Sequence, residues 1–429
     1  MQFEGAALTI LMQNVHKILV RLIYFIVFFI PCILIYILGA LLVRTSIYRV
    51  RVGQVQTHRV GHLSGFTELY FAEKNYLEKS FSVRYVDFIH IDRYTVANSY
   101  LLNKYKEHID VAIPYGLFYL LVKCSEFDKF GFIINIGENI CGDRDVRGLL
   151  EHSDPIVRFS KDELRDFEDQ LIQRGVPREA RVVCVNVRDA EFYRSKPEIN
   201  EMTSYRNSDV STLTPSIKFL TEMGFFVFKM GAARGQKVVI ESDRFIDYQN
   251  IFRDEKLDVY LAFRCEFFIS TGTGWDSLAA ISFRKPGLFF NFMPVGYFPT
   301  WSPSILLATK KHYSNGRLLQ LEEIFNLGAA FCFSTSEFRA LSIELSDQTP
   351  DEILKDVIYF LNKFLGDDEQ SDVLREQSVF KALYSGLYFD NVDKDSFYSR
   401  LHKSPSHGSI KAGFAPSMQE IMPPSGERN

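Results

Sequence analysis

The stretch Ile269-Ser-Thr-Gly-Thr-Gly-Trp-Asp-Ser277 decides the fold of this chain. An apolar run, Glu266–Ser270, leads into it, and a helix-compatible run, Gly274–Phe283, leads out of it. A strand that passes through a glycine- and threonine-rich turn into a helix is typical of parallel α/β sheets. The glycines also allow backbone N–H groups and the helix start to approach an anion closely. The turn therefore predicts an anion site, with a plain tight turn as the alternative.

The same turn excludes two familiar nucleotide-binding motifs. No Gly-Lys-Ser/Thr follows it, so it is not a Walker A loop. Ser277 replaces the third glycine of a dinucleotide fingerprint, and no acid lies at the end of a following strand. A nicotinamide-dependent oxidoreductase is therefore a weak alternative.

The segments on either side of the turn repeat the strand–helix pattern. Strands are expected at Arg181–Val187, Phe225–Met230 and Leu288–Phe292, and helices at Leu213–Met223 and Ile246–Asp258. This alternation predicts a parallel, Rossmann-like sheet with right-handed crossovers. The carboxyl ends of its strands then meet at one edge, where ligands bind in open α/β sheets.

The first half of the chain carries a less regular version of the same pattern. Strands are expected from Tyr48 to Val55, at Val83–Ile91 and at Phe132–Ile136, with a helix through Glu68 between the first two. Ser160-Lys-Asp-Glu163 is a capping-box pattern that starts a helix ending near Gln173. Gly175 and Pro177 stop that helix, so the domain boundary is expected there.

We therefore expect two Rossmann-like α/β domains that face a cleft, preceded by an N-terminal hydrophobic membrane helix. The parts are a membrane anchor (1–47), a first Rossmann-like domain (48–175), a second Rossmann-like domain (176–366) and a partly disordered C-terminal extension (367–429). Thr349-Pro-Asp-Glu352 caps the last helix of the second domain, which is expected to end near Leu365. The Ser-, Pro- and Gly-rich tail from residue 404 predicts disorder.

The anchor is predicted from residues 22–43, which carry no charge and are long enough to cross a bilayer as one helix. Lys17 and Arg21 precede this run, and Arg44, Arg49 and Arg51 follow it. The balance of flanking charge favours a location with the large C-terminal part on the cytoplasmic face of the inner membrane. Pro31 leaves open a kinked segment that lies on the membrane, and a buried helix is a further alternative.

Composition limits the classes of protein that this chain can belong to. Its 429 residues include 47% hydrophobic and 24% charged residues, as in ordinary globular proteins. The net charge of -4 argues against nucleic acid as a partner. The six cysteines form no CxxC pair, so neither a disulfide framework nor a zinc site is expected.

Candidate donor-binding residues follow three of the expected strands. Arg188, at the end of the first strand of the second domain, is able to bind a diphosphate bidentately, and Lys229 brings a cation to the end of the next strand. Salt-bridged loops and ordinary strand exits are the alternatives. The full set of candidate donor ligands is Arg188, Asp189, Arg206, Asn207, Lys229, Gly231, Thr271, Gly272, Thr273, Gly274 and Asp276. Their convergence would form the positive site that a nucleotide diphosphate requires.

Candidate catalytic and acceptor-binding residues lie at a strand-to-helix transition in the first domain. Arg59, Gly61 and His62 are the acceptor candidates, and His62 is a candidate general base towards a hydroxyl group. Glu68 is a competing base, and Arg188 would stabilise the leaving group. No metal ligands are predicted: Asp143-Arg-Asp145 has the letters of a metal motif but lies in a loop of the first domain.

Several of these motifs together resemble a family of bacterial glycosyltransferases that are linked to surface polysaccharide synthesis and are similar to GT-B enzymes. The matching segments are Arg59–Leu63, Glu68–Tyr70, Val187–Asp189, Tyr205–Asn207, Lys229–Gly231, Ser270–Gly274, Arg284–Pro286, Asn291–Phe292 and Leu345–Glu352. The resemblance extends over roughly residues 48–365. A wider similarity to fucosyltransferase-type enzymes, which use an arginine after the equivalent strand, implies a donor-diphosphate role for Arg188. Asn186, Lys229 and Trp275 depart from these patterns.

The resemblance implies a GT-B-like glycosyltransferase that moves a sugar from a nucleotide-sugar donor to a membrane-proximal glycan or lipid-linked acceptor, with 48–175 as the acceptor domain and 176–366 as the nucleotide-sugar-binding domain. Because no metal motif follows an expected strand, we expect neither a metal nor another cofactor. The expected partners are the donor, that acceptor and the membrane. The alternative from another class is a non-catalytic membrane protein that binds a nucleotide or a glycan.

Overall fold

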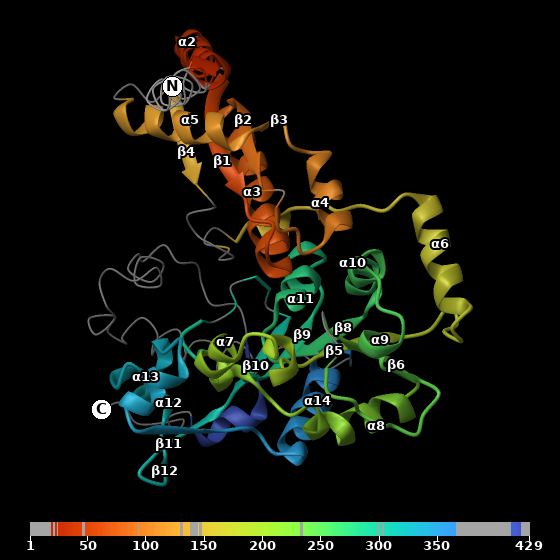
Figure 1. The fold of residues 1–429 in the computed structure, drawn as a ribbon. Coiled ribbons are helices and arrows are strands. Elements are labelled where there is room, and N and C mark those ends of the chain that lie inside the picture. Colours follow the sequence, from red (N-terminus) through yellow and green to blue (C-terminus); the bar gives the residue numbers. More distant parts are fainter. Residues whose placement is uncertain are drawn as a thin grey trace, which may run out of the picture.

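The computed structural model describes most of the chain between residues 19 and 421, and its core is built on two parallel β-sheets (Figure 1). The described residues are 19, 22–23, 25–44, 48–92, 94–128, 132–137, 145, 148–231, 235–297, 299, 301–302, 304–365 and 413–421. The α/β fold class with parallel sheets is confirmed.

The larger sheet belongs to the second half of the chain and has the strand order β14-β10-β9-β8-β5-β6-β7. All of its neighbouring strands run parallel. Its strands are β5 (Val182–Asn186), β6 (Phe226–Met230), β7 (Phe245–Ile246), β8 (Phe267–Ser270), β9 (Gly287–Phe292), β10 (Ile305–Thr309) and β14 (Gly413–Phe414). Every residue of the central strands β5 and β8 is buried, because helices cover both faces of the sheet.

The helices around this sheet are joined to its strands by short crossovers. They are α6 (Lys161–Ile172), α7 (Pro197–Met202), α8 (Thr214–Glu222), α9 (Tyr248–Ile251), α10 (Glu255–Arg264), α11 (Gly274–Ser277) and α14 (Pro350–Leu365). Single turns of other helix types are η2 (Leu150–His152), η3 (Ala190–Tyr193), η4 (Ser204–Arg206), η5 (Val210–Leu213) and η9 (Pro416–Glu420), and α11 continues as the π turn η6 (Leu278–Ser282). The expected capping box of Ser160 with Glu163 is present at the start of α6.

A small antiparallel sheet, β12-β11-β13, lies beside β10. Its strands are β11 (Lys311–Ser314), β12 (Arg317–Leu318) and β13 (Ile343–Ser346). The helices α12 (Leu321–Asn326), η7 (Ala329–Phe331) and α13 (Thr335–Ala340) connect β12 to β13.

The smaller parallel sheet belongs to the first half of the chain and has the order β3-β2-β1-β4. Its strands are β1 (Tyr48–Val55), β2 (Arg84–Ile91), β3 (Val111–Ile113) and β4 (Ile133–Gly137). On one face lie η1 (Phe25–Phe29), α2 (Ile30–Arg44) and α5 (Tyr115–Phe127), which share a separate core with the sheet. The other helices, α3 (Val60–Phe81) and α4 (Ser99–Lys106), pack into the core that continues through the second half.

The two sheets are connected through α3. A Cβ atom placed on Gly61, in the first turn of α3, would lie 3.0 Å from the Cα atom of Gly274 at the start of α11. Nearby, the Asn98 side chain donates to the backbone oxygen of Glu255 at 2.8 Å. The first turn of α3 is therefore held against the glycine turn that follows β8 (Figure 1).

The expected N-terminal membrane helix is wrong. Of the residues that the structure describes, no helix has both the length and the apolar character needed to cross a membrane. The apolar segment forms the π turn η1 followed by the 15-residue α2. Cys32 on α2 is buried in the core shared with β1 and α5. The expected location on the inner membrane stays a prediction.

Two expectations about the second half also need correction. The single helix expected at Ile246–Asp258 is divided into β7, α9 and α10, because the Asp254 side chain caps a new helix by accepting from Lys256 N and Leu257 N. The tail expected to be disordered from residue 404 contains β14, whose Gly413 and Phe414 pair with Leu306 and Leu307.

Candidate functional site: an arginine pair at two strand ends

The pairing of β5 with β8 brings together the two strand ends that the sequence singles out. Asn186 lies opposite Ser270 in the register, so the residues that follow both strands are neighbours. Arg188 N donates to Thr271 Oγ1 at 2.9 Å, and Asn186 Nδ2 donates to Thr273 Oγ1 at 2.6 Å. Asn186, a departure from the family pattern, therefore holds the turn in place.

Three amide groups of the turn donate to protein oxygens and are therefore not open to an anion, which differs from the expectation for them. Thr271 N donates to Asn186 O, and Gly272 N donates to Ser270 Oγ. Thr273 N donates to Asp276 Oδ2, which completes a capping box at the start of α11. The positive charge that an anion would meet here comes from side chains.

That charge belongs to Arg188 and Arg206, which approach the turn from β5 and from η4. Arg206 Nη2 donates to the backbone oxygen of Gly272, and Arg188 Nη2 donates to Thr203 Oγ1 at 2.9 Å. In the described part of the chain neither guanidinium forms an ion pair with a carboxylate. Burial, and then the charge of Arg206, lower the pKa of Arg188 to about 10. Two neighbouring cations without an anion between them are costly to bury, and a bound anion would relieve that cost.

Unpaired polar atoms gather at the same place. Arg188 Nε and Arg206 Nε are buried without a hydrogen-bond partner in the described structure, and so are Asn207 Oδ1 and Ser208 Oγ. Ser208 N donates to Arg188 O at 2.9 Å, which fixes this loop beside the arginine pair. Buried polar groups in folded proteins are nearly always paired, so a cluster of unpaired ones indicates a missing ligand or water. We call Arg188, Arg206, Asn207 and Ser208 the arginine cluster.

Three other predicted donor ligands form a separate group at the end of β6. Lys229 is buried and donates to Gln249 Oε1 at 3.0 Å, with Asp247 Oδ1 at 3.5 Å. A Cβ atom on Gly231 would lie within 2.6 Å of the Gln249 side chain. Asp189 caps η3 and accepts from Gln236 N at 2.9 Å. The charge of Lys229 is therefore paired with Asp247. Arg206 has the buried Asp276 carboxylate as an electrostatic neighbour, but among the described residues the arginine cluster forms no ion pair.

The first half of the chain contributes His62 to the edge of this region. Its neighbour Gly61 touches Gly274, and Arg59 is the N-cap residue of α3. The His62 ring stacks on Phe66 with centroids 4.7 Å apart, and its Nδ1 is buried without a described partner. Burial, followed by electrostatic interactions with Arg59 and with His58, lowers the pKa of His62 to about 4. His62 is therefore neutral at pH 7 and able to accept a proton.

Glu68, the competing base, lies instead in the contact between the two halves of the chain. It is fully buried and accepts from Ile156 N, Tyr105 Oη and Arg284 Nη1, at 2.9, 3.2 and 3.1 Å. Burial raises its pKa to about 7, although Arg284 opposes this shift. A substrate hydroxyl would have to displace these partners to reach it.

This environment predicts a pH-dependent stability that Glu68→Gln removes. Because the folded-state pKa of about 7 lies above the ordinary value of 4.5, the contribution of Glu68 is complete below pH 4.5 and is lost as pH rises through 7. Relative to Glu68→Gln, the wild-type chain should lose about 2–3 kcal/mol of unfolding free energy between pH 4 and pH 8. Urea denaturation across this range measures it. Glu126→Gln, an exposed control, should follow the wild type, and parallel curves for Glu68→Gln and wild type would contradict the assignment.

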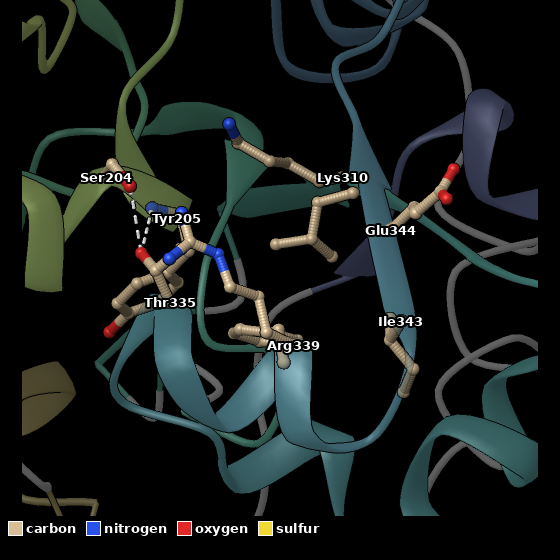
Figure 2. A pocket seen from close by; sticks show the side chains of 9 residues that line it. Ser204, Tyr205, Lys310, Thr335, Arg339, Ile343 and Glu344 are labelled. Atoms are coloured by element: carbon tan, nitrogen blue, oxygen red, sulfur yellow. Dashed lines mark hydrogen bonds between the residues drawn. The ribbon is translucent and has the colours of Figure 1, made fainter.

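A pocket of about 450 Å³ opens beside η4, the turn that carries Arg206. Ser204 and Tyr205 of that turn line it together with Lys310, Thr335 and Arg339. Ser204 Oγ and Thr335 Oγ1 are 2.9 Å apart and link η4 to α13 (Figure 2). Lys310 Nζ donates to Asn207 O, which ties the pocket wall to the arginine cluster. No sequence pattern indicates this pocket, because one wall comes from residues 204–205 and the others come from residues 310–345.

The predicted absence of metal ligands stays a prediction. Within the described residues no group of three or more His, Cys, Asp or Glu side chains is placed to hold a metal ion. Asp143 lies outside the described residues, and Asp145 accepts from Leu149 N and Leu150 N.

The fold and this site define an α/β protein with two parallel sheets and an unpaired arginine cluster at the carboxyl ends of neighbouring strands. No protein family and no curated protein matches the chain. Solved structures with a partly similar fold are glycosyltransferases. A glycosyl transferase of family 9 from Veillonella parvula DSM 2008 is 12% identical, with 73% of this chain and 97% of that chain covered and a TM-score of 0.41.

The iron-containing dodecameric glycosyltransferase TibC from enterotoxigenic E. coli H10407 is 14% identical, with 63% of this chain and 66% of that chain covered and a TM-score of 0.33. TibC in complex with ADP-D-beta-D-heptose, described as a heptosyltransferase, is 14% identical, with 63% and 64% covered and a TM-score of 0.27.

Proposed function

We propose that this protein is a glycosyltransferase that binds the diphosphate of a nucleotide-sugar donor at the arginine cluster. The observation that carries the proposal is the pair of buried Nε–H donors on Arg188 and Arg206, which lack described partners. A pyrophosphate offers acceptor oxygens at the spacing of a guanidinium fork and carries the charge that the pair lacks. The position fits as well, since ligands of open α/β sheets bind at the carboxyl ends of the strands.

Transfer needs the departing diphosphate to be stabilised while an acceptor hydroxyl attacks the anomeric carbon. The arginine pair would stabilise the negative charge that develops on the leaving group. His62, whose neighbour Gly61 touches the turn of the donor site, would accept the proton of the hydroxyl. A glycan or a lipid-linked sugar is the acceptor class that we propose, with Arg59 beside it. The roles of Asp189, Lys229 and Gly231 in holding the donor stay predictions.

A thermal-shift screen of the full chain tests the donor site. UDP, GDP, ADP and dTDP and their sugar conjugates should include at least one ligand that stabilises the protein, by about 2.7 kcal/mol at one hundred times its Kd. The corresponding nucleoside without phosphate should have no effect, because the arginine cluster recognises the diphosphate. Absence of stabilisation by every diphosphate would reject the proposal. Stabilisation by a sugar nucleotide that is never turned over would favour the non-catalytic binding protein.

Replacement of His62 tests the acceptor side. His62→Ala should lower kcat by about 100- to 10,000-fold with little change in donor affinity, because general-base catalysis contributes this much to a rate. His58→Ala is the matched control, since its ring lies 5.3 Å from that of His62, and it should stay within about threefold of wild type.

The pH profile gives an independent test of the same role. A base with a pKa of about 4 keeps kcat/KM constant down to about pH 4, below which activity falls as His62 becomes protonated. An acid limb near pH 6.5 that disappears in His62→Ala would contradict the buried, neutral histidine. Full turnover by His62→Ala would remove it from the mechanism.

A further inference from the structure

The outer surface of α2 is apolar although it is not covered by the described protein. Its inner side packs on the first sheet, with Cys32 and Gly39 buried. Its outer side exposes Ile33, Leu34, Ile37, Leu38 and Leu41, by between 41% and 60% of their surface. A helix that is apolar on all sides needs an apolar partner on each of them, and here the protein supplies only one.

The outer surface of α5 extends this apolar area. Both α2 and α5 pack on the same face of the first sheet, so their outer sides face away from it together (Figure 1). Cys32 Sγ and Cys124 Sγ, 3.2 Å apart, mark the contact between the two helices. Tyr115, Tyr119 and Phe127 are exposed along one stripe of α5 at spacings of four and eight residues. We call the exposed residues of α2 and α5 the outer apolar surface.

Charge along the chain indicates which partner this surface fits. Between Glu4 and Glu68 the sequence contains no acidic residue, and in this stretch Lys17 and Arg21 precede the apolar segment, whereas Arg44 and Arg49 follow it. Basic residues that flank an aliphatic surface favour anionic lipid headgroups above an apolar layer. Tyrosine side chains are enriched where a protein meets the boundary between hydrocarbon and water. Surfaces that bind another protein usually have an apolar centre and a polar rim, which fits the continuous apolar side of α2 less well.

We propose that the outer apolar surface docks onto an anionic phospholipid membrane, with α2 and α5 lying along one side of the bilayer. The aliphatic side chains of α2 enter the boundary between headgroups and acyl chains, and the tyrosines of α5 lie at headgroup level. This inference is independent of the proposed function, because α2 and α5 contribute nothing to the arginine cluster. It would keep the donor domain, at the other end of the molecule in Figure 1, away from the lipid.

Flotation of the purified full chain with lipid vesicles tests the proposal. The chain should float with vesicles of phosphatidylcholine and phosphatidylglycerol and bind at least about threefold less to vesicles of phosphatidylcholine alone. The triple variant Leu34→Gln, Leu38→Gln, Leu41→Gln should lower the partition coefficient by at least about tenfold. The matched control Val239→Gln, Ile251→Gln, Leu327→Gln changes exposed apolar residues of the other domain and should stay within about twofold of wild type.

Far-UV circular dichroism and the thermal unfolding midpoint, measured on both triple variants without ligand, check that each is folded. A wild-type chain that does not float with anionic vesicles overturns the proposal, and so does a Leu34/Leu38/Leu41 variant that floats as wild type does. A lipid-free dimer that this variant dissociates, without vesicle binding by the wild type, would assign the surface to a second copy of the chain instead. Equal binding to both kinds of vesicle overturns the role of the basic residues.

Discussion

Arg188→Ala is expected to weaken the binding of a nucleoside diphosphate by about 10- to 100-fold, because it removes charge-assisted hydrogen bonds to the diphosphate. The same change relieves repulsion between Arg188 and Arg206, which already lowers the pKa of Arg188. The unliganded variant should therefore be about as stable as wild type, although it loses the Arg188–Thr203 hydrogen bond. Calorimetric titration with the diphosphate found in the thermal-shift screen measures the affinity, and chemical denaturation measures the stability.

Arg181→Ala is the matched control for this experiment. Arg181 precedes the same strand, β5, at its opposite end and forms an exposed ion pair with Glu266. Exposed pairs contribute about 0–1 kcal/mol, so the control should alter stability slightly and leave diphosphate affinity unchanged. If Arg188→Ala bound the diphosphate as tightly as Arg181→Ala, the arginine cluster would not be the donor site.

Most strands of both sheets could be predicted from the sequence, because buried strands of a parallel sheet are continuous apolar runs. The strand expected at Tyr48–Val55 has these same bounds as β1, and β5 at Val182–Asn186 lies within the expected Arg181–Val187. Local capping signals were equally informative, as at Ser160. The helix expected at Ile246–Asp258 was wrong because the cap at Asp254 competed with a continuous apolar pattern, and the cap prevailed.

Elements without local signals could not be predicted. The two-residue strand β14 forms only because β10 offers an open edge, and nothing in Gly413–Phe414 itself indicates this pairing. The membrane helix was predicted from the apolar character of the chain alone. An apolar residue that packs on a sheet and one that faces lipid have the same hydropathy, so the sequence does not show that one side of α2 packs on β1.

The sequence predicts which residues of the site meet at the strand ends, because sheet topology determines this. It does not predict which distant side chains pair with them. Arg188 and the turn at Thr271 meet because neighbouring parallel strands end together. Lys229 follows the same rule, yet Asp247 balances its charge and Gln249 accepts its hydrogen bond. Both partners lie in the segment that was expected to be one helix. Pairing of charges, unlike strand order, requires knowledge of the packed structure.

The turn of the donor site depends on glycine at one position, and this gives the second large effect. Gly272 has a φ of 82°, and a Cβ atom there would lie 2.8 Å from the Phe292 ring. Gly272→Ala should lower the free energy of unfolding by about 2–4 kcal/mol, from the left-handed conformation and the overlap together. Chemical denaturation measures this loss. Donor affinity should also fall, because Gly272 O is the acceptor that positions Arg206.

Gly224→Ala separates the two causes of this effect. Gly224 has a φ of 93° but open space around its missing side chain, so its replacement should cost only about 1–2 kcal/mol and leave donor affinity unchanged. Combining Gly272→Ala with Phe292→Leu should recover part of the stability, since it removes the ring that the new methyl group meets. If Gly272→Ala and Gly224→Ala lowered the free energy of unfolding equally, the Phe292 ring would be able to move away from the new methyl group at little cost. The turn would then be held by backbone conformation alone, and the position of Arg206 would not depend on tight packing beneath it.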